Sequence, residues 1–360
     1  MSNSLDGGVS VAPAPDAAGS KASQPLLAVR DLKVHFPRRK AGWFQPPEVV
    51  KAVDGVSFDI ARGSTLGLVG ESGSGKTTTA LAVMRLAPVT AGSIRLGDTD
   101  LSALEGEALR RARRRLQIIF QDPFSSLNPR ERAGSAVRAP LDLMAVGTPA
   151  QRDERVAELF TAVGLRPAQQ HLFPHQFSGG QRQRINIARA LATNPELVVC
   201  DEPVSALDIA IRAQTLNLLA RLQRELGLTY LFISHDMAVV EHICDDLAVM
   251  YLGQIVERAP RQAFFSNPLH PYSVALMSAV PTVSGGRQRA ARRIKLSGDP
   301  PSPINPPSGC RFAGRCPVAE PACTTAPPPL REVVPGHWVA CRRVEIVEGV
   351  PRAPLQLPVI

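Results

Sequence analysis

The sequence predicts an α/β fold in which a mainly parallel sheet is covered by helices on both faces. Three observations support this fold class. Short apolar stretches typical of buried strands alternate with stretches of helical periodicity. The glycine-rich segment GESGSGKTT, residues 70–78, lies between an apolar stretch and a helical one, and LVVCDEP, residues 197–203, is an apolar strand ending in two acidic residues. A chain of 360 residues is longer than a single hydrophobic core usually supports, so a second, smaller unit is expected.

The first 25 residues are rich in Ala, Ser, Gly, Pro and Asp, which predicts a disordered tail. They lack the basic segment and apolar core of a signal peptide, and no apolar run in the chain approaches the ~18–20 residues that span a bilayer. We therefore expect a cytosolic protein. The net charge is +9, but aromatic residues make up only 5% and no basic stripe alternates with them. This favours a basic protein near an anionic membrane or a polyanionic ligand over one that binds nucleic acid.

The elements expected next alternate along the chain. Strand-like stretches are expected at 27–36, 50–60 and 64–70, with a proline-broken loop at 36–48. A helix is expected to start within 75–86. Further helices are expected at 101–116, within 130–173, at 185–194 and at 210–226, and further strands at 116–123, 197–203 and 229–236.

The glycine-rich segment fits the pattern G-x-x-x-x-G-K-[ST] in the strand-to-helix context that a phosphate-binding loop requires. Its glycines let the backbone curl so that N–H groups and the helix N-terminus face phosphate oxygens. Lys76 is expected to reach the β- and γ-phosphates of ATP, and the Thr77 hydroxyl to ligate Mg²⁺. The expected nucleotide-binding residues are Gly70, Ser72, Gly73, Ser74, Gly75, Lys76, Thr77 and Thr78.

A nucleotide-hydrolysing site also needs a second metal anchor and a group that positions water. Both are expected in LVVCDEP. Asp201, at the end of the strand, can hold Mg²⁺ through water, and the adjacent Glu202 is the candidate general base.

The segment FSGGQRQR, residues 177–184, resembles the signature of ATP-binding cassette (ABC) ATPases, although Phe177 stands where many cassettes have Leu. The resemblance covers about residues 26–260. It implies that the signature binds the ATP held by another subunit, so that two cassettes sandwich two nucleotides. The residues implied in this contact are Ser178, Gly179, Gly180 and Gln181.

The remaining motifs of that family occur in the expected order. Gln121 in FQDP resembles the Q-loop glutamine, which senses the nucleotide and its Mg²⁺ and contacts the transport partner. Residues 205–208, SALD, resemble the D-loop, and His235 resembles the switch histidine that contacts the γ-phosphate. The aromatic residue that stacks on adenine is expected to be Phe36, with Trp43 and Phe44 as competitors.

The resemblance implies a P-loop NTPase, RecA-like core with an antiparallel β edge and an inserted helical subdomain at about 122–184. The nucleotide-binding domain is then expected at 26–262, and a small irregular domain containing four cysteines at 263–360.

Three further segments resemble the ATPase subunits of dipeptide and oligopeptide importers, and they extend the resemblance to about residue 343. They are FQDPFSSLNPR at 120–130, NPLHPYSVALMSAVP at 267–281 and LSGDPPSPINPPSGCRFAGRCP at 296–317. This implies an ATPase at the cytoplasmic face of the cell membrane. Its partners would be a second, similar ATPase, two transmembrane permeases and an extracytoplasmic solute-binding protein. Import of nickel or glutathione is an alternative within the same group. A soluble ABC ATPase without a transport role is a further, less favoured alternative.

Four cysteines lie close together near the end of the sequence, in a proline-rich stretch that cannot build much core. They are spaced C-x5-C-x6-C-x17-C, unlike the C-x2-C pair of zinc ribbons. Four thiolates suit a 4Fe-4S cluster or Zn²⁺, and the resemblance favours the cluster; four reduced or weakly paired cysteines are the third alternative. The four are Cys310, Cys316, Cys323 and Cys341.

Overall fold

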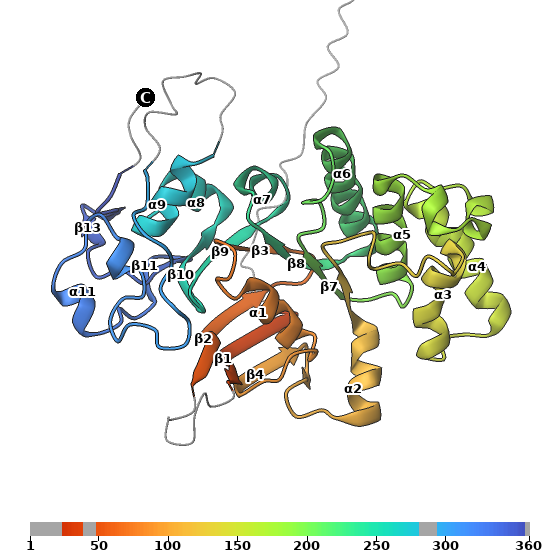
Figure 1. Ribbon diagram of the computed structural model, residues 1–360, viewed down its shortest axis with the longest axis horizontal. Helices are drawn as coiled ribbons and strands as arrows, with labels where there is room; N and C mark the ends of the chain where they lie inside the picture. Colours follow the sequence, from red (N-terminus) through yellow and green to blue (C-terminus); the bar gives the residue numbers. More distant parts are fainter. Residues whose placement is uncertain (1–23, 39–47, 281–293, 357–360) are drawn as a thin grey trace, which may run out of the picture.

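The computed structural model describes residues 24–38, 48–280 and 294–356. An eight-stranded sheet with the order β11-β12-β10-β9-β3-β8-β7-β6 crosses the molecule, and a four-stranded sheet with the order β2-β1-β4-β5 lies beside it (Figure 1). The helical elements α3 to α5 are at one end of the long axis, and the C-terminal elements are at the other.

The centre of the large sheet is parallel. Strand β3 pairs with β8 and β9, and β7 pairs with β8 and β6. Every residue of β3, β7 and β8 is buried, as expected for strands covered on both faces. The strands span Thr65–Val69 (β3), Leu116–Ile119 (β6), Leu197–Asp201 (β7), Thr229–Ser234 (β8) and Asp246–Tyr251 (β9).

Two separate cores form on the two faces of this sheet. Helices α6 (Ile209–Leu226) and α7 (Met237–Ile243) contribute to one core, and α1 (Lys76–Val83) to the other, where it packs with the four-stranded sheet (Figure 1). Both faces of the parallel strands are therefore covered, and the ends of these strands are the expected place for a site.

The four-stranded sheet forms the expected antiparallel edge. Its strands are β1 (Leu27–Pro37), β2 (Val49–Ile60), β4 (Ala91–Leu96) and β5 (Thr99–Asp100), all antiparallel to their neighbours. The helix expected at 101–116 is shorter: α2 spans Gly106–Ala112 and passes into a 3₁₀ turn, Arg113–Arg115. The proline-broken loop falls mostly at 39–47, outside the described residues.

The inserted helices are α3 (Ala133–Leu143), α4 (Pro149–Ala162) and α5 (Gly179–Leu191). Thr148 starts α4 with a capping box, and proline takes the first helical position, where its missing N–H is not needed. Helix α5 begins six residues before the expected 185, because Ser178 supplies a capping box of its own. The strand expected at 116–123 ends at Ile119.

The C-terminal region is more regular than expected. Strand β12 (His337–Val339) pairs with β10 (Gln254–Pro260), and β11 (Arg331–Val334) pairs with β12, so this region extends the main sheet. Strands β4, β9 and β10 were not predicted from the sequence. Strands β9 and β10 are buried along most of their length and so lack a clean period of two, whereas β4 alternates only over its last residues. The other elements are α8 (Arg261–Ser266), α9 (Pro271–Ser278), a 3₁₀ turn (Ala313–Arg315), α11 (Ala322–Thr325), β13 (Glu345–Val347) and β14 (Val350–Arg352).

A buried carboxylate joins the C-terminal region to the sheet. Glu257 of β10 is fully buried and accepts hydrogen bonds from the backbone N–H groups of Leu269 (2.8 Å) and His270 (2.7 Å). Its Oε1 also lies 2.8 Å from Nε2 of His337 on β12. Burying a carboxylate is costly unless its oxygens are satisfied, so these contacts fix how the two parts meet.

No helix within the described ranges has the length and apolar character needed to cross a membrane.

Candidate functional site

A pocket of about 570 Å³ opens at the carboxyl ends of the parallel strands. The glycine-rich segment lines it together with residues from the ends of β6, β7 and β8. Of the residues predicted from the sequence, Ser72, Gly73, Gly75, Lys76, Thr77, Thr78, Gln121, Glu202 and His235 line it. The predicted groups on four separate loops therefore meet around one cavity.

Two glycines of the segment are required by its geometry. Gly70 and Gly75 have φ values of 150° and 103°, in the range that side-chain-bearing residues rarely adopt. A Cβ on Gly70 would lie 2.2 Å from the Met250 carbonyl oxygen, and one on Gly75 would lie 2.3 Å from the Ala52 carbonyl oxygen. The loop can turn tightly into α1 only because both positions lack a side chain.

Lys76 is buried at the base of the loop. Its Nζ donates to the carbonyl oxygens of Gly70 (2.9 Å) and Glu71 (2.8 Å) and to Ser74 Oγ (3.4 Å). Burial lowers the pKa of Lys76, while the nearby carboxylates of Glu202, Asp201 and Glu71 oppose that shift. A cation fixed in this way is suited to an anionic ligand.

Asp201 does not itself line the pocket, but it contacts Thr77, which does. The Thr77 Oγ1 donates to Asp201 Oδ1 at 3.2 Å, which brings the end of β7 against the start of α1. Burial raises the pKa of Asp201, and the neighbouring Glu202 raises it further. A hydroxyl and a carboxylate are the oxygen ligands that Mg²⁺ prefers, so the pair fits the predicted metal position.

Glu202 lies between two polar side chains. Gln121 Nε2 donates to its Oε2 at 3.0 Å, and His235 Nδ1 lies 2.9 Å from its Oε1. The backbone of Glu202 has φ of 47°, a conformation that costs energy for a non-glycine residue and is typical of functional sites. Ser205, the first residue of SALD, stabilises this turn by donating its hydroxyl to the Glu202 carbonyl oxygen at 3.0 Å.

The signature lies elsewhere on the surface of this chain. Ser178 caps α5: its Oγ accepts from Gln181 N at 3.3 Å, and Gln181 Oε1 accepts from Ser178 N at 3.0 Å. In the described part of the chain, the residues lining the nucleotide-type pocket include neither these two nor Gly179 and Gly180. The structure therefore separates the signature from the P-loop of the same chain.

Phe36 is 37% exposed and does not line the pocket, although its partner in the β1–β2 register, Val50, does. Trp43 and Phe44 lie outside the described residues. Sequence reasoning missed several wall residues because they carry no motif. These are Val50, Lys51, Ala52, Leu252, Gly253 and Pro303.

The four C-terminal cysteines line a single small pocket. All are free thiols, and burial raises the pKa of Cys316 to about 11. Among the described residues, however, no group of three or more His, Cys, Asp or Glu side chains could hold a metal ion. The expected cluster or zinc ion therefore has no support in the positions of these side chains.

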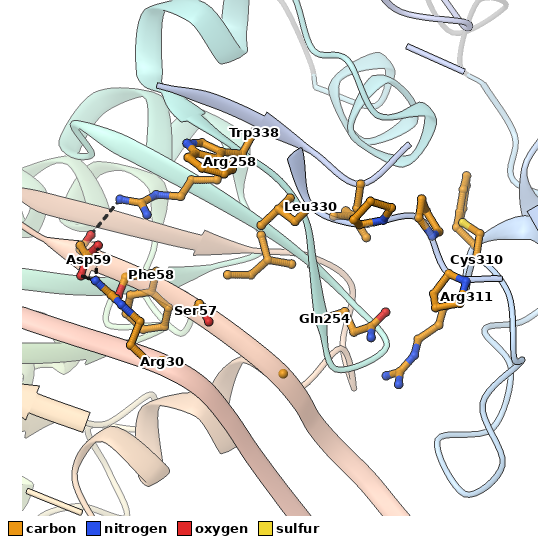
Figure 2. Close-up of a pocket in the computed structure, with 18 residues that line it drawn as sticks. Arg30, Ser57, Phe58, Asp59, Gln254, Arg258, Cys310, Arg311, Leu330 and Trp338 are labelled. Atoms are coloured by element: carbon orange, nitrogen blue, oxygen red, sulfur yellow. Dashed lines mark hydrogen bonds and ion pairs between the residues drawn. The ribbon is translucent and has the colours of Figure 1, made fainter. Parts of the chain in front are cut away.

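A further pocket of about 610 Å³ lies between β2, β10 and the C-terminal region. Figure 2 shows Arg30, Asp59 and Arg258 gathered at one end of it and Cys310 with Arg311 at the other. Arg30 pairs with the Asp59 carboxylate, and Arg258 donates to the Asp59 backbone carbonyl oxygen.

Family models match two parts of the chain. Residues 53–205 match the ABC transporter model, and residues 256–323 match the model described as the C-terminal region of oligopeptide/dipeptide transporters.

Two similar proteins cover nearly all of the chain. The oligopeptide transport ATP-binding protein AppF of Bacillus subtilis is 49% identical over 88% of this chain and 97% of its own length. The dipeptide transport ATP-binding protein DppF of Escherichia coli is 47% identical over 91% of this chain and 97% of its own length. Among solved structures, a dimeric post-hydrolysis state of the ATP-binding cassette MJ0796 bound to ADP and Pi is 27% identical with a TM-score of 0.57. The matched region covers 65% of this chain and 98% of the MJ0796 chain.

Proposed function

The chain belongs to the ABC transporter ATPases of the oligopeptide and dipeptide type, and we propose that within this role Glu202 activates the water that hydrolyses ATP. The observation that carries the proposal is the position of its carboxylate, between Gln121 and His235 and in the same pocket as Lys76. A general base must be oriented by neighbours and must face the phosphate that is attacked. Gln121 and His235 orient the Glu202 carboxylate, and this carboxylate lines the pocket that would hold the phosphates.

The P-loop residues would bind the phosphates of ATP. Thr77 and Asp201 would hold Mg²⁺, with Gln121 as a further ligand, and the ion would neutralise charge on the phosphates. Lys76 would stabilise the same charge from the base of the loop, and His235 would contact the γ-phosphate while keeping Glu202 oriented. Phe36 of β1 is proposed to stack on the adenine of ATP.

The site is proposed to be complete only in a pair of ATPases. Ser178 and its following glycines start a helix whose amide groups can face a phosphate, but they lie outside this chain's own pocket. They would instead bind the ATP of a second, similar ATPase, whose signature would close the pocket described above.

The transmembrane partners are proposed to dock beside Gln121. Phe120 and Phe124 lie on either side of this residue in sequence and are 40% and 53% exposed, so they offer apolar surface that a partner could cover. Two permeases of the importer would cover them, which would place the chain at the cytoplasmic face of the membrane. An extracytoplasmic solute-binding protein would deliver the solute to the permeases.

Peptides are the proposed cargo because the relatives that cover nearly the whole chain are named for oligopeptide and dipeptide transport. Nickel and glutathione are the alternatives within the same group. A soluble ABC ATPase acting on other macromolecules is less favoured. The chain matches the model for the C-terminal region of oligopeptide/dipeptide transporters in addition to the ABC transporter model.

The experiment is reconstitution of the chain with its cognate permeases, second ATPase and solute-binding protein in liposomes. ATP-dependent uptake of labelled dipeptides and oligopeptides, lost in Glu202→Gln, supports the proposal. Uptake of nickel or glutathione alone would reassign the cargo. An ATPase that copurifies with no permease would contradict the transport role itself.

For the four cysteines we propose a 4Fe-4S cluster rather than Zn²⁺. The proposal rests on the family resemblance of this region and on the four cysteines lining one pocket, although the side chains as they lie do not form a metal site among the described residues. A cluster of four irons is larger and can be reached by thiolates that stand further apart. When bound, it would staple the proline-rich stretch, with a structural or redox-sensing role.

Anaerobic purification with iron, acid-labile sulfide and zinc analysis tests this. About four irons and four sulfides per chain, lost in Cys316→Ser, support the cluster. One zinc ion per chain without sulfide would show that the cysteines bind a structural zinc ion instead of a cluster. The absence of any metal would reject both the cluster and the zinc ion.

A further inference from the structure

The C-terminal region is in direct contact with the P-loop through an ion pair. Arg315 Nη1 lies 2.8 Å from Glu71 Oε2, and its Nη2 lies 3.3 Å from Glu71 Oε1, so the guanidinium holds the carboxylate with two hydrogen bonds. The Arg315 side chain is only 10% exposed and also lies 3.4 Å from the Tyr251 hydroxyl. A bidentate pair in partly buried surroundings is stronger and better defined than an exposed one.

Glu71 is the second residue of the P-loop, and each of its polar groups has an assigned partner. Its carboxylate is held by Arg315, and its backbone N–H donates to the Tyr272 hydroxyl at 2.7 Å. Its carbonyl oxygen accepts from Lys76 Nζ at 2.8 Å. The residue that helps to position the phosphate-binding lysine is thus itself positioned by groups from the C-terminal third of the chain.

Arg315 directly precedes Cys316, which lines the four-cysteine pocket. The chain from Cys310 to Cys316 is a compact turn, in which Ala313 N donates to Cys310 O (3.0 Å) and Cys316 N donates to Ala313 O (3.3 Å). Phe312, inside this turn, packs its ring edge-on against Tyr251 at 5.2 Å between centroids. A displacement of the cysteines would therefore move Arg315 with them.

A second tether connects the same turn to the nucleotide pocket. Arg311 is buried and donates to the Leu252 carbonyl oxygen and to Asp54 of β2. Figure 2 shows Arg311 beside Cys310 at the end of the neighbouring pocket. Leu252 and Gly253 line the nucleotide pocket, so the turn contacts this pocket from two sides.

We propose that Arg315 is a positioning residue for ATP binding, which acts through Glu71 on Lys76 and thereby couples the four-cysteine pocket to the P-loop. The inference rests on the proposed function, because it assumes that Lys76 binds ATP phosphates. It does not depend on what the four cysteines hold.

The test is a fluorescent ATP analogue titrated with Mg²⁺ into the purified full-length chain. The variants are Arg315→Met, Arg315→Lys, Glu71→Gln and the double variant Arg315→Met/Glu71→Gln. The matched control is Arg331→Met, because Arg331 is a partly buried arginine of the same region that donates to the Val344 carbonyl oxygen instead. Thermal unfolding without nucleotide measures any purely structural effect of each variant.

The expected result is a Kd for the analogue raised roughly fivefold or more in Arg315→Met and Glu71→Gln, with no further loss in the double variant. Arg315→Lys should recover part of the affinity, and Arg331→Met should bind as the wild type does. If Arg315→Met binds as tightly as the wild type, or if its loss adds fully to that of Glu71→Gln, the inference is overturned.

A fifth variant separates this inference from the proposed function. Lys76→Ala must abolish binding if the pocket is the ATP site; binding that survives it would reject the proposed function and not only the role of Arg315. Cys316→Ser tests the coupling further. It should weaken binding in the wild-type background and have no additional effect in Arg315→Met, and an equal loss in both backgrounds contradicts coupling through Arg315.

Discussion

Glu202 and His235 are in direct contact across the ends of two neighbouring parallel strands, with 2.9 Å between Oε1 and Nδ1. They are 33 residues apart in sequence and follow β7 and β8, which pair in parallel from Leu197–Thr229 to Asp201–Ile233. Because paired parallel strands end at the same edge of a sheet, the two side chains meet there without any local signal between them.

Glu202→Gln should abolish hydrolysis and leave ATP binding nearly intact. The amide keeps the shape and can still contact Gln121 and His235, but it cannot accept a proton from water. We expect the turnover rate of the assembled transporter to fall by about 10²–10⁴-fold.

Steady-state ATPase assays and nucleotide titrations measure these two effects separately. Glu196→Gln is the matched control, because Glu196 precedes β7 whereas Glu202 follows it, and its carboxylate pairs with Arg62 and Arg115 far from the pocket. A Glu202→Gln variant that turns over at the wild-type rate would remove Glu202 from the reaction.

Thr77→Val should raise the Mg²⁺ concentration needed for half-maximal ATPase activity. The substitution is nearly isosteric, but it removes the hydroxyl that donates to Asp201 at 3.2 Å and that is proposed to ligate the ion. The measurement is ATPase activity against Mg²⁺ at saturating ATP. An unchanged Mg²⁺ dependence would show that the hydroxyl is not a ligand.

Gly75→Ala should disrupt the P-loop far more than Gly73→Ala. Both glycines have positive φ, which costs about 1–3 kcal/mol for a residue with a side chain. Only at Gly75 would the new Cβ also lie 2.3 Å from the Ala52 carbonyl oxygen, while a Cβ on Gly73 meets nothing within 4 Å. Nucleotide affinity of the two variants, measured alongside their thermal stability, should rank them in this order; equal effects would reject the steric argument.

His270 should make the protein less stable as the pH falls below neutrality. Burial lowers the pKa of this residue from 6.5 to about 4, and its Nδ1 accepts from Tyr272 N at 3.1 Å, which requires the neutral ring. Since the unfolded chain binds this proton first, stability is lost as the pH drops from the unfolded pKa towards the folded one. The loss should be about 2 kcal/mol between roughly pH 7.5 and pH 5.

Urea unfolding at the two pH values measures this loss. His270→Asn keeps an acceptor at the start of α9 and has no proton to bind, so its stability should change less over the same interval. A variant with the same pH dependence as the wild type would assign the effect to other groups.

The P-loop residues and the Asp201–Glu202 pair could be predicted from the sequence, because phosphate chemistry demands particular residue types at fixed spacing. Gln121 and His235 could be predicted only from the resemblance to the ABC family. The parallel core could be predicted for a similar reason: strands buried on both faces are continuous apolar runs, as in β3, β7 and β8. The narrower family resemblance in the C-terminal region agrees with relatives that cover nearly the whole chain.

Only the tertiary structure decided which distant residues meet. It placed Pro303 and Val50 in the wall of the nucleotide pocket, joined β12 to β10, and set Arg315 against Glu71, 244 residues away. A local sequence pattern depends on the contacts that a segment makes with its neighbours along the chain. Contacts such as the Arg315–Glu71 pair depend on how separate segments pack against each other, so they cannot be predicted from residue spacing.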